Sequence, residues 1–461
     1  MLGMEVDRKC GGSMYKNIYD HIDGITLFLL SALIRVSIFM GGGTGLIFPD
    51  SASYIEYSFF EFRRSPGYPL VISVFQCLMG DNWKLGVVIF QIAMACLSVV
   101  ILYKTIIMVF DEIQKSVDIP IFVRKPIAYI ISLLFAPIPS LSIWDHSIHT
   151  ESLSVSCSVF FIYMSIKWIL SKKTKDGAIA ALVGLLGFMI KTALFIYPIC
   201  LIILWVLMFV SEKTQRKNIL GMGILLGFVV VFFVIWVRMV YKYTGVVSVS
   251  DLTALHSLIK TIDTGQYKYW PDAELVNEIE QVIISRGPDT SVADIAHEAI
   301  NIFPDKKSVV AYTKYCLNAD RENYYKYQIL LMWNNRWTSV ITPYSSLRFI
   351  PGYIEAAYHV FFKVLYIFIF ALFGLLMGMI RWIRHKSCPY IIIGLSGGML
   401  TILISVFWGS YAEWGRLLVY IVPFIFVSVS YYIYIIIGKV VNIYDLNKHG
   451  QLSDMERNDS E

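Results

Sequence analysis

The sequence predicts an all-α polytopic membrane protein of about ten transmembrane helices, with a helical insert at its outer face after the seventh. Of the 461 residues, 57% are hydrophobic and only 16% are charged, whereas about 25% of the residues of soluble domains are charged. The mean hydropathy is +0.62. The apolar residues are also gathered in runs near the length of about 20 residues that a helix needs to cross a bilayer.

These runs locate the predicted spans. Those with the length of one span are Gly24–Gly41, Leu85–Phe110, Pro126–Trp144, Glu151–Leu170, Ile219–Lys242, Ala357–Ile380, Tyr390–Trp408 and Arg416–Ile437. The run Ala178–Val210 is too long for one span and is interrupted at Lys191, so we expect two spans, Ala178–Ile190 and Ala193–Val210. Pro66–Gly80 is apolar but short, and we expect it to lie in the membrane interface.

The placement of basic residues decides between these alternatives. The clusters of Lys and Arg between spans all fall on one side only if Pro66–Gly80 does not cross the membrane and Ala178–Val210 crosses it twice. The positive-inside rule makes that side cytoplasmic. The net charge of +5 is then explained by topology, and nothing indicates a nucleic-acid partner. The predicted organisation is a cytoplasmic N-terminus (1–23), seven spans (24–242) with an outer loop (42–84) containing the interface helix (66–80), an extracytoplasmic insert (243–356), three spans (357–437) and a cytoplasmic tail (438–461).

The insert itself is predicted to be helical. Helical patterning covers Ala273–Ser285, Ser291–Ile302 and Ser308–Trp333, and Ser291 with Asp294 forms a capping-box pattern.

Asp50 in the first outer loop allows two interpretations. It follows a proline and precedes Ser51, which is typical of a helix start, and either residue could cap free backbone N–H groups there. An acidic residue fixed just outside a span is also placed to act chemically at the membrane surface. The local sequence leaves both interpretations open.

Further polar residues gather at the predicted outer ends of spans. Asp145, His146, His149 and Glu151 share one short turn, and His with carboxylate can bind a divalent metal. Because their spacing matches no strict ligand pattern, a polar turn at the end of a span is the favoured interpretation.

The cations near span ends need anionic partners or contact with headgroups. Lys191 should face a cavity or an anion because a buried ammonium is costly, unless it reaches the outer headgroups. Arg416, Arg63 and Arg64 could each meet a phosphate or serve as interfacial anchors. Arg35 lies deep in the first span and needs a partner inside the bundle, which the sequence does not identify.

Together with this layout, four segments carry a resemblance to a known family: PDSASYIEYSFFEFRRSPGYPLVISVF, HTESLSVSCSVFFIYM, GRLLVYIVPFIF and DRENYYKYQILLMWNNRW. The chain resembles the GT-C superfamily of membrane glycosyltransferases, which includes protein O-mannosyltransferases, aminoarabinose transferases and oligosaccharyltransferases. The resemblance implies a GT-C fold and transfer of a sugar from a polyprenyl-phosphate carrier to a glycan, lipid or protein acceptor. It places the enzyme in a bacterial cytoplasmic membrane, in contact with membrane lipid, with its active site on the extracytoplasmic side.

The resemblance also implies roles for residues. Asp50 would be catalytic, and the residues expected to bind substrates are Tyr54, Arg63, Arg64, Asp145, His149, Glu151, Lys191 and Arg416. Several relatives have a second carboxylate next to the first-loop Asp, whereas Ser51 and Ala52 follow it here. The cofactor is therefore left unknown: a divalent metal held by Asp50, Asp145, His146, His149 and Glu151 is an alternative that is not favoured. The alternatives to a glycosyltransferase are a transporter or flippase, or a polymerase or ligase, of lipid-linked glycans.

Overall fold

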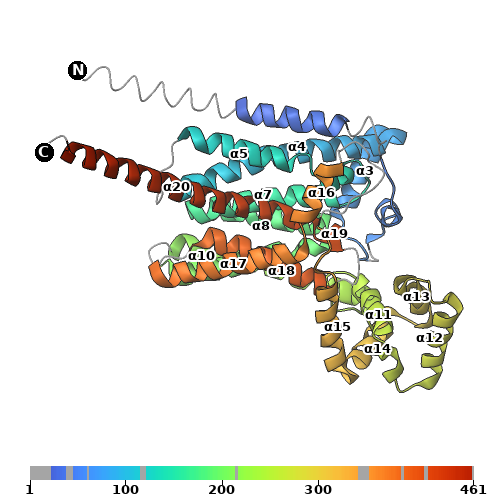
Figure 1. Cartoon of the computed structure of the whole chain (residues 1–461). Helices are drawn as coiled ribbons and strands as arrows, with labels where there is room; N and C mark the ends of the chain where they lie inside the picture. Colours follow the sequence, from blue (N-terminus) through green and yellow to red (C-terminus); the bar gives the residue numbers. More distant parts are fainter. Residues whose placement is uncertain are drawn as a thin grey trace.

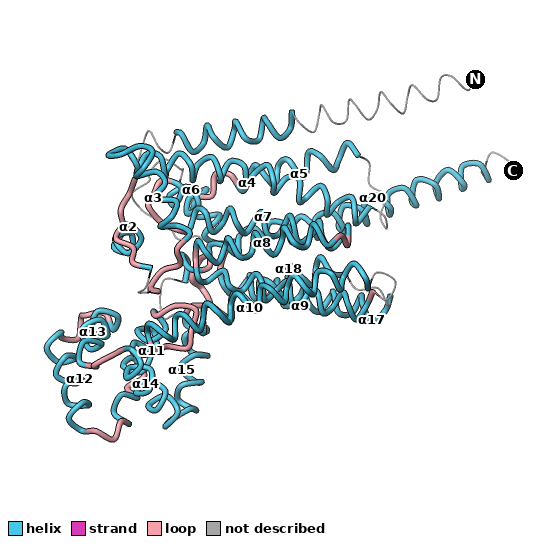
Figure 2. Tube along the Cα trace, turned by 180° about the vertical axis from the view of Figure 1, so that it is seen from behind, coloured by secondary structure: helices cyan, strands magenta, loops and turns pink. Residues whose placement is uncertain are grey.

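The computed structural model of the chain describes residues 22–37, 45–59, 62–114, 121–212, 216–340, 352–385, 389–409 and 414–458. Within these ranges there is no strand, and only two isolated β-bridges occur, Leu46 with Ser147 and Ser339 with Lys363. The helices form a long bundle with a smaller helical group at one end (Figure 1). The start of the helix 22–37 and the end of α20 (Val422–Asn458) lie at the opposite end, and the view from behind agrees (Figure 2).

The bundle consists of helices that run roughly along one common direction (Figure 1). Besides the helix 22–37 and α20 it contains α3 (Gly67–Met79), α4 (Trp83–Gln114), α5 (Ile121–Phe135), α7 (Glu151–Ser171), α8 (Thr174–Ile190), α9 (Ile196–Ser211), α10 (Arg216–Thr244), α17 (Val364–His385) and α18 (Tyr390–Gly409). One large hydrophobic core joins these helices apart from α3, with Trp144, Trp168, Tyr197 and Tyr434 among its fully or almost fully buried members. α3 packs against α4 in a smaller cluster that includes Tyr68 and Ile72.

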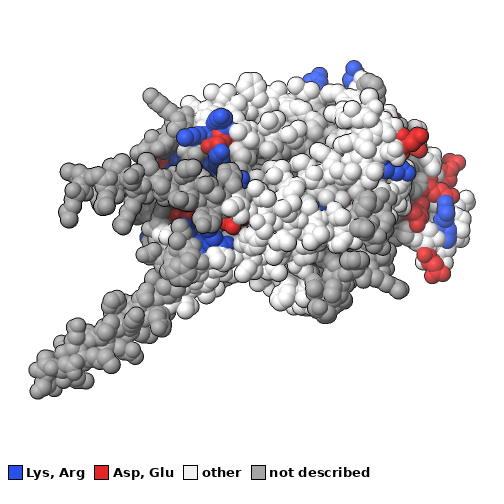
Figure 3. All heavy atoms as spheres, turned by 90° about the horizontal axis from the view of Figure 1, so that it is seen from above, with Lys and Arg blue, Asp and Glu red and all other residues white. Residues whose placement is uncertain are grey.

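The outer surface of the bundle suits a bilayer. Seven helices of the described ranges are long and apolar enough to cross a membrane, and many large apolar side chains are exposed on them, such as Leu78, Phe228 and Ile383. On the face shown in Figure 3, charged side chains gather at the two ends, and the surface between them is largely uncharged. The predicted all-α multi-span fold is confirmed. The count of about ten spans stays a prediction, because α5 and α8, with 15 and 17 residues, are shorter than the seven.

Prolines divide two segments that the hydrophobic pattern predicts as single spans. Pro126–Trp144 was expected to be continuous, but α5 ends at Phe135 and α6 (Pro139–Asp145) begins after a break at Ile138. A residue before proline is pushed out of the helical region, and Ile138 is extended, with ψ of 118°.

The last predicted span begins with a similar break. α19 (Trp414–Leu417) and the short 3₁₀ turn η8 (Val419–Ile421) precede α20, whose second residue is Pro423. Proline is tolerated in the first turn of a helix, where no intrahelical partner is lost. Ala357–Ile380 is likewise divided, into α16 (Gly352–Phe361) and α17.

The break predicted at Lys191 is present. α8 ends at Ile190, Lys191 is extended with φ of −144°, and η4 (Thr192–Phe195) leads into α9. The start of α3 meets this break closely, because a Cβ atom on Gly67 would lie 2.6 Å from the carbonyl oxygen of Met189. Only glycine allows the first-loop helix to approach the end of α8 so closely.

The helical group at the end of the bundle is the predicted insert. It contains α11 (Leu252–Asp263), α12 (Ala273–Arg286), α13 (Val292–Ala299) and α14 (Lys306–Ala319) around its own hydrophobic core. α15 (Arg321–Asn334) follows, and its Leu331 and Met332 pack against the core of the bundle. The N-cap half of the capping-box pattern is present, since the N–H of Asp294 donates to Ser291 Oγ, and that hydroxyl donates to the Asp294 carboxylate. The predicted helix Ser308–Trp333 is wrong as a single element. It is divided at Asp320, whose side chain accepts from the N–H of Asn323 and begins α15.

The insert is fastened to the C-terminal end of α18. Carbonyl groups at a helix end have no partner within the helix, and α11 supplies donors to two of them. Nδ1 of His256 lies 3.0 Å from the carbonyl oxygen of Gly409, and Lys260 Nζ donates to that of Trp408. The side of α11 that carries these residues therefore lies directly above the bundle.

Candidate active site

The loop with Asp50 is held against the turn between α6 and α7. Leu46 forms a parallel bridge there: its N–H donates to His146 over 3.1 Å, and its carbonyl accepts from Ile148 over 2.9 Å. Ser51 Oγ then accepts from the N–H of Phe48 and donates to the carbonyl of Ile148. Asp50 is thus fixed next to His149 by contacts between segments about 100 residues apart in sequence.

Asp50 does not act as a helix cap. It lies inside the 3₁₀ turn η1 (Pro49–Ser51) before α2 (Ala52–Ile55), and it is Ser51 whose side chain caps this turn, by accepting from the N–H of the N-cap residue Phe48. The Asp50 carboxylate instead binds two arginines: Oδ1 lies 2.8 Å from Arg64 Nη2 and Oδ2 lies 2.8 Å from Arg416 Nη1. The carboxylate is 30% exposed, so it remains accessible from the cavity described below.

Arg64 is itself held in place. Its Nε donates to Ser53 Oγ over 2.8 Å, and its guanidinium lies over the ring of Tyr54, 4.7 Å from the centroid. Arg416 comes from the broken start of the last span and reaches His149 as well, with 3.2 Å between Nη1 and Nε2. The two arginines therefore approach Asp50 from segments more than 350 residues apart.

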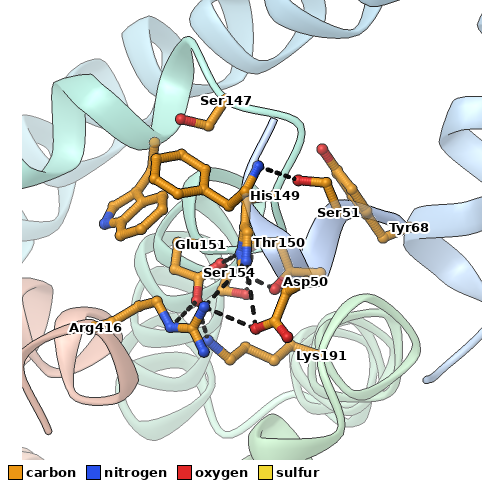
Figure 4. Close-up of polar contacts among 12 residues, drawn as sticks. Asp50, Ser51, Tyr68, Ser147, His149, Thr150, Glu151, Ser154, Lys191 and Arg416 are labelled. Atoms are coloured by element: carbon orange, nitrogen blue, oxygen red, sulfur yellow. Dashed lines mark hydrogen bonds and ion pairs between the residues drawn. The ribbon is translucent and has the colours of Figure 1, made fainter. Parts of the chain in front are cut away.

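A second carboxylate, Glu151, lies behind the first. It is buried at the start of α7, where Oε1 lies 2.9 Å from Lys191 Nζ and 3.6 Å from Arg416 Nε, and Oε2 contacts His149 Nδ1. His149 Nε2 is 3.8 Å from Asp50 Oδ2. Figure 4 shows Asp50, His149, Glu151, Lys191 and Arg416 converging on one point.

The charges of this cluster favour the ionised form of the Asp50 carboxyl and the protonated form of the His149 imidazole, two groups that lie outside the spans. Burial opposes ionisation of Asp50, but His149, Arg64 and Arg416 outweigh it and hold the pKa of the carboxyl well below its ordinary value. Burial also opposes protonation of His149, yet the neighbouring Glu151 and Asp50 carboxylates raise the pKa of its imidazole above the ordinary 6.5.

Asp145 and His146, in the same turn, face elsewhere. Asp145 Oδ2 lies 2.7 Å from Arg35 Nε, and Oδ1 accepts from Ser152 Oγ, all inside the bundle. This ion pair supplies the partner that Arg35 needs. Asp145 does not line the cavity around Asp50, so the prediction that it binds substrate gains no support from its position.

The donors in this cluster do not suit a divalent metal. No group of three His, Cys, Asp or Glu in the described part of the chain is arranged to hold one. Asp50 binds two guanidinium groups and Glu151 binds Lys191, and cations repel a metal ion from the same oxygens. The candidate metal ligands Asp50, Asp145, His146, His149 and Glu151 therefore do not form a metal site in this arrangement.

A cavity of about 300 Å³ lies between the end of the bundle and α11, with Asp50 in its wall. Its lining includes most of the predicted binding residues: Tyr54, Arg63, Arg64, Lys191 and Arg416. His149 and Glu151 lie behind this wall. Sequence reasoning missed four other lining residues, which come from α11, α13, α18 and η8: His256, His297, Ser405 and Tyr420.

An apolar groove adjoins the cavity. It has a volume of about 550 Å³ between α9 and α10 and shares Phe195 and Val249 with the cavity lining. Several of its side chains, among them Ile199, Val234 and Val247, are exposed on the outside of the bundle. The groove therefore opens on the surface that would face lipid and borders the cavity whose wall holds the cations around Asp50.

A further residue that sequence reasoning missed supports this turn from within. Gln91 of α4 is fully buried, and its amide nitrogen donates to three carbonyls of the α6–α7 turn, those of Trp144, Asp145 and Ser147. Its oxygen accepts from Tyr68 of α3 over 2.8 Å. A side-chain amide in the middle of the apolar run Leu85–Phe110 was the available signal.

Of the comparisons with known proteins, only the comparison with solved structures found similar proteins. No protein-family model matches the sequence, and no curated protein is similar to it. Similar solved structures include the oligosaccharyltransferase AglB from Archaeoglobus fulgidus, in complex with an inhibitory peptide and a dolichol-phosphate and in the apo form. Both are 12% identical, with TM-scores of 0.44 and 0.45, and each comparison covers 93% of this chain. The chain spans 52% of the length of these archaeal proteins.

A second similar structure is ArnT from Cupriavidus metallidurans bound to undecaprenyl phosphate, which is 13% identical with a TM-score of 0.32. That comparison covers 88% of this chain and 77% of ArnT. At such scores the similarity carries no argument about the substrates of this chain, which have to be inferred from its own cavity.

Proposed function

We propose that the chain is an integral membrane glycosyltransferase. It would transfer a sugar from a polyprenyl-phosphate carrier to a hydroxyl group of a glycan, lipid or protein acceptor on the extracytoplasmic side. The observation that carries this proposal is the continuity of an apolar, outward-facing groove with a cavity lined by Arg63, Arg64, Lys191 and Arg416. A ligand that fits both parts has a long apolar chain and an anionic head.

The cations would bind the carrier phosphate. Guanidinium groups match phosphate oxygens through paired N–H donors, and an ammonium adds a point charge. In the transfer step, the acceptor oxygen forms a bond to C1 of the sugar, and the bond from C1 to the phosphate oxygen breaks. The electron pair of the broken bond stays on the phosphate, where Arg64, Arg416 and Lys191 stabilise the added charge.

Asp50 would take the proton that the acceptor hydroxyl loses. Among the residues that the structure describes, it is the one carboxylate in the lining of the cavity, and the space above it is bounded by α11 of the insert. An acceptor that arrives from the aqueous side therefore reaches Asp50 without crossing the apolar groove. Glu151 and His149 lie behind Asp50 and position Lys191 and Arg416.

The test is a transfer assay with purified protein in lipid nanodiscs, a set of radiolabelled polyprenyl-phosphate sugars and extracted envelope glycans, lipids and proteins as acceptors. Asp50→Asn should slow transfer about 10²–10⁴-fold, the usual effect of losing a general base. The matched control is Glu56→Gln, because Glu56 lies exposed in the same loop and does not line the cavity; it should transfer at the parent rate. Transfer by Asp50→Asn at the parent rate would show that Asp50 is not the base.

A further inference from the structure

All three cations nearest to Asp50 are already paired with carboxylates. Asp50 binds Arg64 through one oxygen and Arg416 through the other, each over 2.8 Å. Glu151 binds Lys191 over 2.9 Å and approaches Arg416 Nε to 3.6 Å. These are the groups that the proposed function assigns to the carrier phosphate, so an incoming anion meets carboxylates in the positions that it needs.

Of the two carboxylates, Asp50 is the one that an incoming phosphate can displace from the cations. Glu151 is 1% exposed and belongs to the first turn of α7, whereas Asp50 is 30% exposed in a short 3₁₀ turn at the cavity wall. In the structure, both oxygens of Asp50 are bound to cations, which makes the carboxylate a weak base. A phosphate at the same two guanidinium groups would draw them away and place a negative charge beside Asp50, and both effects raise the proton affinity of a carboxylate.

We infer that the Asp50 carboxylate and the carrier phosphate are competing partners of the Arg64–Arg416 pair, so that donor binding releases Asp50 to act as a base. The inference rests on the proposed function. It adds an order to the reaction: the polyprenyl-phosphate sugar binds first, and the acceptor hydroxyl is activated only in the donor complex. His149 supports this exchange, because its Nε2 lies 3.8 Å from Asp50 Oδ2 and would stay beside the carboxylate when Arg416 turns to the phosphate.

If Asp50 competes with the phosphate, a variant that lacks its charge should bind the phosphate more tightly and not more weakly. Removing the charge of Asp50 abolishes the competitor while leaving both arginines in place, so the affinity for the phosphate should increase. The probe is undecaprenyl phosphate without sugar, titrated into the purified full-length chain in nanodiscs. We expect Asp50→Asn to lower its Kd about tenfold, within the range of one charge-assisted hydrogen bond at a partly exposed site.

Matched variants separate competition from a general change in the site. Asp50→Glu keeps the carboxylate and should bind the probe within about threefold of the parent, and Glu56→Gln should bind it as the parent does. Arg416→Gln should weaken binding about tenfold or more. In the double variant Asp50→Asn/Arg416→Gln, the gain from removing Asp50 should shrink to about threefold or less, because one of the contested guanidinium groups is gone.

The outcomes also distinguish this inference from the proposed function. If the parent protein binds the probe and transfers sugar, but Asp50→Asn binds it equally or more weakly while unfolding at the parent temperature, Asp50 does not compete and the inference is wrong. If the parent neither binds undecaprenyl phosphate nor transfers sugar, the proposed function is wrong and the inference is wrong with it. If Asp50→Asn unfolds early, an unchanged Kd in a further variant, Asp50→Ser, overturns the inference instead.

Discussion

Breaking the ion pair between Arg35 and Asp145 should destabilise the protein strongly. Their side chains are 1% and 2% exposed, and Nε lies 2.7 Å from Oδ2. Arg35→Met would leave the Asp145 carboxylate buried with the hydroxyl of Ser152, which now binds its other oxygen at 2.6 Å. Removing one partner of a buried pair costs about 3–5 kcal/mol, since the remaining charge is left uncompensated away from water. Asp145→Asn should cost a similar amount because the guanidinium of Arg35 is then unpaired.

The double variant Arg35→Met/Asp145→Asn gives the decisive comparison. It removes both charges, so its free energy of unfolding should recover to within about 1–2 kcal/mol of the parent value, because the desolvation cost disappears together with the attraction. The control is Glu322→Gln on α15, which breaks the exposed pair with Lys326 and should cause no measurable change.

The assay is equilibrium unfolding in mixed micelles, followed by helical circular dichroism, for the parent, the two single variants and the double variant. A coupling of at least about 2 kcal/mol between the two positions is expected. The reasoning would be refuted by single variants that lose less than about 1 kcal/mol, or by a double variant that is no more stable than either single one. Such a result would mean that water or another group compensates the buried charge.

Two further predictions concern the turn between α6 and α7 and the docking of the insert. Gln91→Met should cost about 1–3 kcal/mol, because it leaves buried carbonyls without donors. It should also lower the transfer rate without changing the affinity for undecaprenyl phosphate; a change in affinity alone would contradict a positioning role. Burial lowers the pKa of Lys260 from the ordinary 10.5 to about 8. Between these values the unfolded chain binds a proton that the folded protein does not, so thermal stability should rise from about pH 8 to 10.5. In Lys260→Met this rise should be flattened, and an identical rise in both proteins would contradict the assignment.

The hydrophobic runs of the sequence predicted the fold. The breaks within predicted helices depend on single residues, such as a proline or a capping side chain, and not on the apolar content of the run. Pro139 divides a run that has ample apolar length, because the residue before a proline leaves the helical conformation. Asp320 divides the predicted helix after Ser308 by accepting from Asn323 N–H, although the residues on both sides favour helix. The break at Lys191 was predictable since an ammonium does not lie in the middle of a span without a partner.

Most ionisable residues of the site could be predicted from the sequence, but the ion pairs that they form with one another could not. Asp50, Arg64, Lys191 and Arg416 were singled out because ionisable groups near span ends need partners, and the structure brings them together. The partner of each group could not be predicted, since Asp50 and Arg416 are 366 positions apart in the sequence. The helix-start pattern indicated a cap at Asp50 or Ser51; Ser51 provides it by accepting from Phe48 N–H, whereas both carboxylate oxygens of Asp50 are bound by the two arginines. Arg35 remained without a partner for the same reason until Asp145 was found beside it.

The groove between α9 and α10 has a consequence for how a ligand reaches the site. A lipid that slides in from the side is concentrated by its own solubility in the bilayer, so the relevant quantity is its mole fraction among lipids and not its amount per litre of buffer. A modest intrinsic affinity is then sufficient for high occupancy. Diluting the membrane with inert lipid at constant total protein and carrier should empty the groove, while adding buffer should leave it filled. The exposed side chains of Ile199, Val234 and Val247 thus make the composition of the surrounding membrane a direct control on the rate of the proposed reaction.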